Sequence, residues 1–483
     1  MFTYQDLQTV ADDDKARMEF VRAVIDDHKA SELYKTAQIA DEYDRHRNRT
    51  IVEYQKLLYD VTGNTVPDNW SANFKMASKF FNRFITQENQ YLLGNGVTFN
   101  ADSTKDALGG DDFDTVLQDA GKKALWGGVS YGFFNKDHVD VFSVLEFAAL
   151  PDEEDGAVKA GVRFWQIDTT KPLRATLYEL DGYTDYIWNK REDTGKYEGQ
   201  VLHAKRTYIE HVRTSVADGD EIYDGENYPT FPIVPLWGNP HHQSEIVGIR
   251  EQIDCYDLIK SGYANNVDEG SLIYWTLQNA GGMDDIDLAQ FIEKMKTLHA
   301  ATTDNAVSAE PHQLEAPYES REALLMKLRT DLYDDAMALD VKAIEGGAVT
   351  ATQIKAAYEP LNAKTDQYEY CVRDFLKRLL AVAGIEDTPT FTRSIIVNNQ
   401  EEMQLIVQAA QFLDQEYVTR KILELLGDGD KADEILDKMA ADELERAQEA
   451  RDMAIMQTTK EVPESFTQGA QQAQQAPQGG EVE

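Results

Sequence analysis

The spacing of apolar residues changes twice along the chain, and no single class of secondary structure produces all of the patterns. In the first quarter of the chain, apolar side chains such as Val21, Val24 and Ile25 recur at helical spacing. Between residues 131 and 208 they alternate with polar residues in short runs bounded by Gly, Asp and Asn, which is typical of antiparallel strands. Helical spacing then returns. We therefore expect an α+β, mainly helical protein, and its 483 residues suggest more than one core.

The helices expected after the β region differ in length and pattern. Residues 244–264 and 318–340 each predict one helix, and Arg250, Asp254 and Asp257 share a polar face of the first. A long helix is expected from residue 352 to about 382. Because Pro360 inside it removes a hydrogen bond and clashes with the preceding turn, this position predicts a kink.

Further helices are expected at other places along the chain. Residues 73–93 and 113–130 predict two before the β region, and residues 400–426 and 430–455 predict two near the end. From Thr458 onward the chain is rich in Gln, Ala and Gly, which cannot bury a core and predicts a disordered tail.

Charge limits the partners that the chain can bind tightly. It carries 86 acidic and 47 basic residues, for a formal net charge of -39. Such a chain as a whole repels nucleic acid and anionic membranes, so any contact with DNA should be weak and local. No apolar run approaches the roughly 18 residues that a membrane helix needs, and no membrane partner is expected.

Catalytic motifs are missing or weak. The sequence contains no phosphate-binding loop of the Gly-x-x-x-x-Gly-Lys-Ser/Thr type and no His-Glu-x-x-His motif. The acidic run 152–155 and the pair His241-His242 are the places that could attract a metal ion, although a solvated turn and an exposed loop explain them better. Cys255 and Cys371 lie in expected helices, where core packing is the ordinary role. We expect no enzyme, no metal and no cofactor.

Four segments occur in an order that resembles the portal proteins of long-tailed phages. They are FKMASKFFNRFITQENQYLLGNGVTF from Phe74, FPIVPLWGN from Phe231, the helix that starts at SEIVGIREQIDCYDLIKSGY from Ser244, and IEGGAVTATQIKAAYEPLNAKTDQYEYCVRDFLKRLL from Ile344. Each segment is short, and the shared order carries the resemblance. The segment from Ile344 lacks the Ser-Gly usual in the family, and the C-terminal helical part is short.

The resemblance implies a portal fold with named regions. These are a wing (1–240), a stem helix (244–267), a clip (268–317), a second stem helix (318–340), a channel loop (341–351), a kinked long wing helix (352–384), a crown (385–457) and a tail (458–483). The channel loop would contain Lys342, Glu345, Gly346, Gly347, Ala348, Val349 and Thr350. Small residues there permit a mobile loop that approaches DNA without obstructing it.

The resemblance also implies partners and a place in the phage. The chain would form a ring of about twelve copies at a capsid vertex, through which double-stranded DNA passes without sequence recognition. It would meet the terminase large subunit, a head-completion or adaptor protein, and the major capsid and scaffold proteins, after synthesis in the cytoplasm of a bacterial host. Two alternatives stay open, a generic virion structural or scaffold protein without a DNA channel and a metal-dependent hydrolase with an acidic site.

Overall fold

The computed structural model describes most of the chain. The described residues are 2–59, 64–69, 71–190, 197–214, 221–269, 274–278, 286, 308–312, 318–343, 351–394, 403, 406–426 and 429–460. Contacts divide the chain into two units. Unit 1 comprises Met1–Ile344 and Ala357–Ile395, and unit 2 comprises Glu345–Ala356 and Ile396–Glu483. Among the helices in these ranges, none is long and apolar enough to cross a bilayer.

Unit 1 begins with four helices, and side chains cap the start of the first three. Asp13 accepts hydrogen bonds from the backbone amides of Lys15 and Ala16 and starts the second helix. Ser31 ends that helix and caps the next through the amide of Tyr34. The four helices are α1 (Tyr4–Thr9), α2 (Asp14–Ala30), α3 (Glu32–Asp44) and α4 (Arg49–Glu53).

A helical layer follows, and its first long helix starts later than the sequence predicts. The expected helix 73–93 is α5 (Phe80–Leu93), because residues 71–79 contain no helix and make other hydrogen bonds, described below. Its partner α7 (Phe113–Gly127) ends at Gly128, whose φ of 82° favours glycine. Between them lie β3 (Val97–Thr98), α6 (Asp102–Ala107) and a 3-10 turn (Gly110–Asp112).

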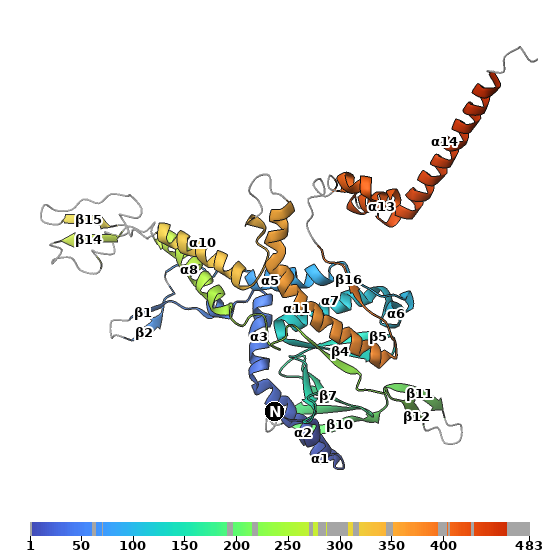
Figure 1. Ribbon diagram of the computed structural model, residues 1–483. Coiled ribbons are helices and arrows are strands. Elements are labelled where there is room, and N and C mark those ends of the chain that lie inside the picture. Colours follow the sequence, from blue (N-terminus) through green and yellow to red (C-terminus); the bar gives the residue numbers. More distant parts are fainter. Residues whose placement is uncertain are drawn as a thin grey trace, which may run out of the picture. The chain divides into compact units, whose positions relative to one another are not determined.

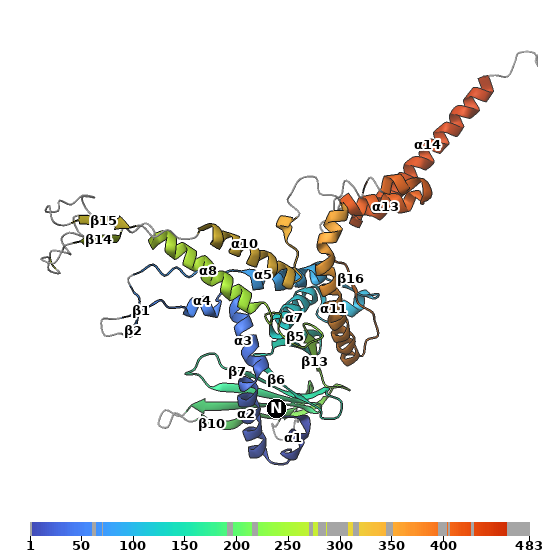
Figure 2. The same ribbon diagram turned by 60° about the vertical axis from the view of Figure 1, so that its left-hand side comes forward.

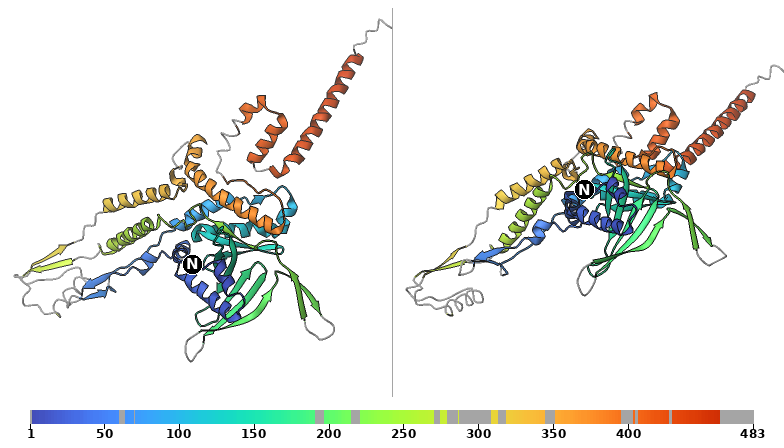
Figure 3. Two further views of the ribbon diagram at one scale, coloured as in Figure 1. Left: turned by 60° about the horizontal axis from the view of Figure 1, so that its bottom comes forward. Right: turned by 90° about the horizontal axis from the view of Figure 1, so that it is seen from below.

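The β region forms antiparallel sheets, as the alternating pattern predicts. A five-stranded sheet has the order β10-β9-β8-β7-β6, and α2 packs on it through a core that includes Val21, Ile25 and Val162 (Figure 3). A three-stranded sheet has the order β13-β4-β5, which places Pro235 on an edge strand where its missing N–H costs nothing. The strands are β4 (Val129–Asn135), β5 (His138–Ser143), β6 (Phe147–Pro151), β7 (Val158–Trp165), β8 (Leu173–Glu179), β9 (Gly182–Lys190), β10 (Tyr197–Arg206) and β13 (Ile233–Trp237).

Four smaller pairings complete the strands of unit 1. One joins β3 to β16 (Thr390–Phe391), which lies far away in the sequence. The other antiparallel pairs are β1 (Leu57–Tyr59) with β2 (Thr65–Pro67), β11 (Ile209–Thr214) with β12 (Glu221–Glu226), and β14 (Tyr274–Gln278) with β15 (Ser308–His312). Most of the predicted clip lies outside the described residues. Its described residues include β14 and β15.

In the described part of the chain, three helices that belong wholly or mostly to unit 1 follow the β region (Figure 1). The first two, α8 (Arg250–Glu269) and α10 (Tyr318–Asp335), pack against each other, and both are shifted or shortened relative to the predicted 244–267 and 318–340. The third, α11 (Ala351–Ala383), agrees with the expected long helix and contains Pro360. Its residues Val372 and Phe375 join the main core with α3, α5 and α7.

Cys255 departs from expectation, since its side chain is exposed on α8 while that of Cys371 is half-buried.

Unit 2 is helical in its described part. It contains the first residues of α11, 3-10 turns at Ala410–Phe412 and Gly429–Lys431, α13 (Gln415–Leu426) and α14 (Ala432–Lys460). The last helix runs slightly beyond the predicted end of the crown at 457. Residues 461–483, the rest of the predicted tail, lie outside the described part of the chain.

Candidate functional site

The predicted channel loop, 341–351, begins with a short 3-10 turn, Val341–Ala343, that contains Lys342. The side chain of Lys342 is exposed, and its backbone amide donates to Asp340 Oδ1 at 3.1 Å. The other predicted loop residues, from Glu345 to Thr350, lie outside the described residues. The site can therefore be built from the groups that hold the chain before the loop, at the end of α10, and from those that hold the body of α11 in unit 1.

The end of α10 is a tight cap around Met337. The amide of Ala338 donates to the carbonyl of Tyr333 at 3.0 Å, and Met337 itself has a φ of 52°, a left-handed conformation that usually belongs to glycine. This cap explains why the helix stops at Asp335. The apolar pattern continues to Leu339 because Ala336 and Leu339 are both buried.

Side chains of α5 and α10 hold the segment that follows this cap. Gln87 on α5 binds both backbone groups of Leu339, accepting from its amide at 3.0 Å and donating to its carbonyl at 3.1 Å. Arg329 binds both oxygens of Asp340, at 2.7 and 2.6 Å. A bidentate pair of this kind fixes direction as well as distance. The chain therefore enters the predicted loop from a fixed position.

A buried lysine ties α11 to the same place. Lys364 Nζ lies 2.9 Å from Glu88 Oε2 on α5 and 2.7 Å from Glu245 Oε2 just before α8, and it donates to the carbonyl of Ala336 at 3.3 Å. Burial raises the pKa of Glu88 to about 7, although the charge of Lys364 opposes the shift. The two carboxylates raise the pKa of Lys364 against the effect of burial, so the lysine is charged. The ammonium group of Lys364 thus links α11 to α5, to the segment before α8 and to the end of α10.

This Lys364 cluster was not predicted, although the sequence contains a signal for it. Lys364 occupies a position in the buried stripe of α11, between Leu361 and Tyr368, and Glu88 lies between Phe84 and Leu92 on the buried side of α5. Lysine and glutamate are almost never fully buried unless they are paired. A lysine in the apolar stripe of one helix and a glutamate in that of another therefore predict that the two helices pack together and pair these charges.

The predicted stem face, Arg250, Asp254 and Asp257, is a polar face of α8 that other parts of the same chain cover. Tyr43 and Thr50 both donate to the carboxylate of Asp254, Thr50 at 2.7 Å, and Arg250 lies 3.7 Å from it. Asp257 is fully buried. These side chains therefore hold the protomer together.

The same face of α8 also binds an extended segment. The backbone amides of Phe74, Met76 and Ser78 donate to Asn265 Oδ1, Ser261 Oγ and Asp257 Oδ1 at 2.7, 3.0 and 2.9 Å. The alternate amides of an extended chain thus meet successive turns of a helix. This pairing is why residues before Phe80 do not join α5, contrary to the prediction of a helix from residue 73.

Replacing Asp257 with alanine is expected to lower the free energy of unfolding by about 1–3 kcal/mol. The change leaves the amide of Ser78 and the side-chain amide of Asn48, both buried, without their acceptor. Asp257→Asn keeps one acceptor oxygen and should lose less. Chemical denaturation measures both, with the exposed Glu251→Ala on the same helix as the control. Equal stability of Asp257→Ala and the control would contradict this role.

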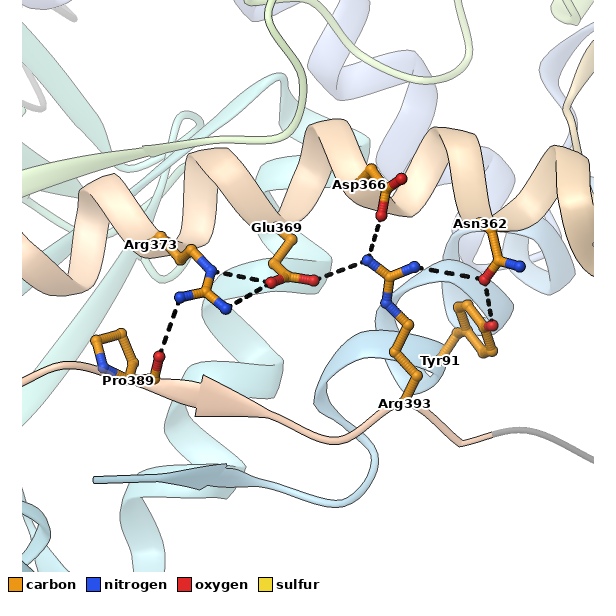
Figure 4. A network of polar contacts seen from close by, with 7 residues as sticks. All are labelled: Tyr91, Asn362, Asp366, Glu369, Arg373, Pro389 and Arg393. Atoms are coloured by element: carbon orange, nitrogen blue, oxygen red, sulfur yellow. Dashed lines mark hydrogen bonds and ion pairs between the residues drawn. The ribbon is translucent and has the colours of Figure 1, made fainter. Parts of the chain in front are cut away.

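A second network fixes the end of unit 1 to α11 (Figure 4). Arg393 binds Asp366 and Glu369, the latter at 2.8 Å, and lies 3.4 Å from the side-chain oxygen of Asn362. Arg373 binds Glu369 at 2.7 Å and the carbonyl of Pro389 at 3.2 Å. The chain therefore leaves unit 1 from an anchored position. Pro360, two residues before this network begins at Asn362, is exposed.

The two weak metal candidates do not form a site. Lys159 pairs with Asp152 and lies 3.6 Å from Asp155, and this pairing lowers the pKa of Asp152 to about 2. His242 stacks on Trp237 with 3.8 Å between ring centres. Within the described parts of the chain, no three His, Cys, Asp or Glu side chains come together in a way that could hold a metal ion.

Comparison with known proteins identifies the family to which the chain belongs. Residues 23–456 match the family described as "Phage portal protein, SPP1 Gp6-like", and the chain belongs to this family. The portal protein of Bacillus phage SPP1 is 25% identical over 423 residues, which are 80% of this chain and 79% of that protein. The portal protein of Clostridium phage phiCD119 is 22% identical over 246 residues, 46% of this chain and 54% of that protein.

Solved structures of gene transfer agents are also similar. A chain from "Neck of empty GTA particle computed with C6 symmetry" is 11% identical with a TM-score of 0.42, covering 71% of this chain and 90% of its own length. A chain from "Virion of native gene transfer agent (GTA) particle" is 11% identical with a TM-score of 0.40, covering 72% and 89%.

Membership of this family shows the broad function of the chain. The chain is a portal protein, a structural component of the phage virion. The expectations of a virion protein and of no enzyme are confirmed by the family, and the hydrolase alternative is left without support. A portal protein of this family works as an oligomeric ring.

Proposed function

We propose that about twelve copies of the chain form a closed ring at one capsid vertex, and that the ring is the channel through which double-stranded DNA is packaged and ejected. The observation that carries this proposal is the family match, which spans residues 23–456 and so includes α8, α10, α11 and everything between them. In a ring, these helices from all copies would surround a common axis. A generic virion scaffold protein would not require that arrangement.

The regions of the fold are assigned on the same basis. In this proposal residues 244–267 and 318–340, which include most of α8 and α10, are the stem, residues 268–317 are the clip, and residues 341–351 are the channel loop. The wing comprises residues 1–240 and the long helix 352–384, and the crown comprises residues 385–457. The hydrogen bonds between Gln87 and Leu339 support this assignment, because they fix the residues from which the chain enters the loop.

Charge supports a channel that does not bind its cargo tightly. A chain with a net charge of -39 offers few phosphate contacts, so DNA slides without sequence recognition. The energy for packaging would come from a separate motor, the terminase large subunit, which docks on the clip. A head-completion or adaptor protein would replace it after packaging. The major capsid and scaffold proteins would surround the wing, with assembly taking place in the bacterial cytoplasm.

Native mass spectrometry of the purified chain tests the assembly. The expected spectrum has one dominant species whose mass is a single whole multiple of the chain mass, because a closed ring admits only one copy number at a time under given conditions. A scaffold that grows into shells or filaments would give a broad distribution. A monomer under all assembly conditions would count against a portal ring.

A further inference from the structure

The residues directly after α10 are suited to continue that helix, although the helix ends before them. Residues 336–343 contain no glycine or proline, and the first glycine after them is Gly346. Six of the eight are alanine, methionine, leucine or lysine, which are good helix formers. In a continued helix, Leu332, Ala336 and Leu339 would share one face, because they are spaced by four and three residues. The local sequence therefore does not require the break.

The break also has a conformational cost. Met337 has a φ of 52°, a left-handed conformation that is unfavourable for a residue with a side chain and that glycine adopts freely. The amide of Ala338 donates to the carbonyl of Tyr333, and the amide of Met337 donates to the carbonyl of Asp334. This is the bond pattern in which glycine usually ends a helix. Contacts with other parts of the chain therefore have to offset the cost.

Side chains of two other helices bind the backbone groups that a continued helix would use. In an α-helix, each amide donates to the carbonyl four residues earlier. Gln87 of α5 instead binds both the amide and the carbonyl of Leu339, at 3.0 and 3.1 Å. The carbonyl of Ala336 accepts from Lys364 of α11 at 3.3 Å. Figure 2 shows α5 and α11 at this end of α10. These contacts oppose continuation of the helix.

An ion pair within the same region is incompatible with a continuous helix. Arg329 binds both oxygens of Asp340, at 2.7 and 2.6 Å. In a continuous helix these two residues would lie roughly 16 Å apart along the axis, at about 1.5 Å per residue. Their side chains could not meet across that distance. The ion pair therefore forms only while the chain turns back after α10.

We propose that residues 336–343 are a two-state hinge, so that α10 either ends before them, as in the structure, or continues through them as one helix. The contacts of Gln87, Lys364 and Arg329 favour the first state. Helix propensity and relief of the left-handed backbone at Met337 favour the second. Continuation lengthens α10 by about 12 Å. In the proposed ring it would move the point from which each chain enters its channel loop, and this consequence alone rests on the proposed function.

The distance between two spin labels tests the hinge in the full chain. Nitroxides are attached to Glu322→Cys and Lys342→Cys, two exposed positions, in a background with Cys255→Ser and Cys371→Ala. An excess of unlabelled copies keeps distances between copies out of the signal. The labelled residues lie roughly 30 Å apart along the axis of a continuous helix. They lie closer when the chain turns back, so the chain with an unaltered hinge should give mainly the shorter distance.

Variants that remove the contacts should shift the balance between the two states. Gln87→Leu with Asp340→Ala removes the bonds to Leu339 and the ion pair, so the longer distance should become the more populated one. Asp340→Ala alone should shift a smaller share of copies in the same direction. The matched control, Gln90→Leu with Asp334→Ala, makes the same changes at exposed positions of the same two helices and should keep the shorter distance dominant.

A glycine substitution should reverse this shift. Adding Met337→Gly to the double variant should restore the shorter distance, because glycine adopts the left-handed conformation freely and is unfavourable inside a helix. Double and single variants that keep the circular dichroism of the wild type and show only the shorter distance would overturn the hinge. So would a broad distribution without a population near about 30 Å. Wild-type protein without rings would overturn the proposed function and leave the distances as the test of the hinge.

Discussion

The Lys364→Met variant is expected to lose about 3–5 kcal/mol of its free energy of unfolding, because it leaves the buried carboxylate of Glu88 and the partly buried carboxylate of Glu245 without their cation. Methionine fills similar space, so the loss reports the charge rather than a cavity. Chemical denaturation of the protomer measures it. The control is Lys377→Met on the exposed side of the same helix, which should change stability by less than about 0.5 kcal/mol.

The loss should depend on pH in a defined direction. The pKa of Glu88 is raised from 4.5 to about 7 in the folded protein, so its contribution to stability is fully present below pH 4.5 and is lost as the pH rises through about 7. Without the charge of Lys364 that pKa rises further. The variant should therefore be weakest at neutral and alkaline pH and partly recover near pH 5, and Glu88→Gln should restore part of the loss at pH 8. A deficit that does not vary with pH would contradict this account of Lys364.

Packaging should fail when the predicted channel loop becomes bulky and stiff. Replacing Gly346 and Gly347 with valine restricts the backbone and narrows any channel that the loops enclose. Procapsids should assemble around normal rings and yet package little DNA. The matched control replaces the same two residues with alanine, which adds little bulk and should package far more. Normal packaging by well-formed valine rings would leave the segment as a plain linker between α10 and α11 and leave the family assignment standing.

Local patterns in the sequence predict much of the fold. The alternation between residues 131 and 208 corresponds to real strands, and Pro235 lies on the edge strand where its chemistry requires it. The long helix with Pro360 inside it is present with nearly the predicted bounds. Because these features depend on residues close together in the sequence, they can be predicted without knowledge of tertiary contacts.

The parts that the sequence predicts poorly depend on distant partners. The start of α5 is misplaced because the amides of Met76 and Ser78 bind α8, and no local signal reports that bond. The polar face of α8 can be recognised in the sequence. Whether that face contacts solvent or another part of the chain, such as Thr50, depends on the tertiary fold. The positions of Lys364 and Glu88 in apolar stripes indicate that both charges are buried and paired. The sequence does not indicate which residues pair with each of them.

Electron microscopy of the purified wild-type chain tests the central claim most directly. End-on averages should show a closed ring with one copy number and an axial opening wide enough for duplex DNA, and side views should narrow toward the proposed stem, α8 and α10. Particles without an axial opening, or open filaments and shells in place of rings, would contradict the account.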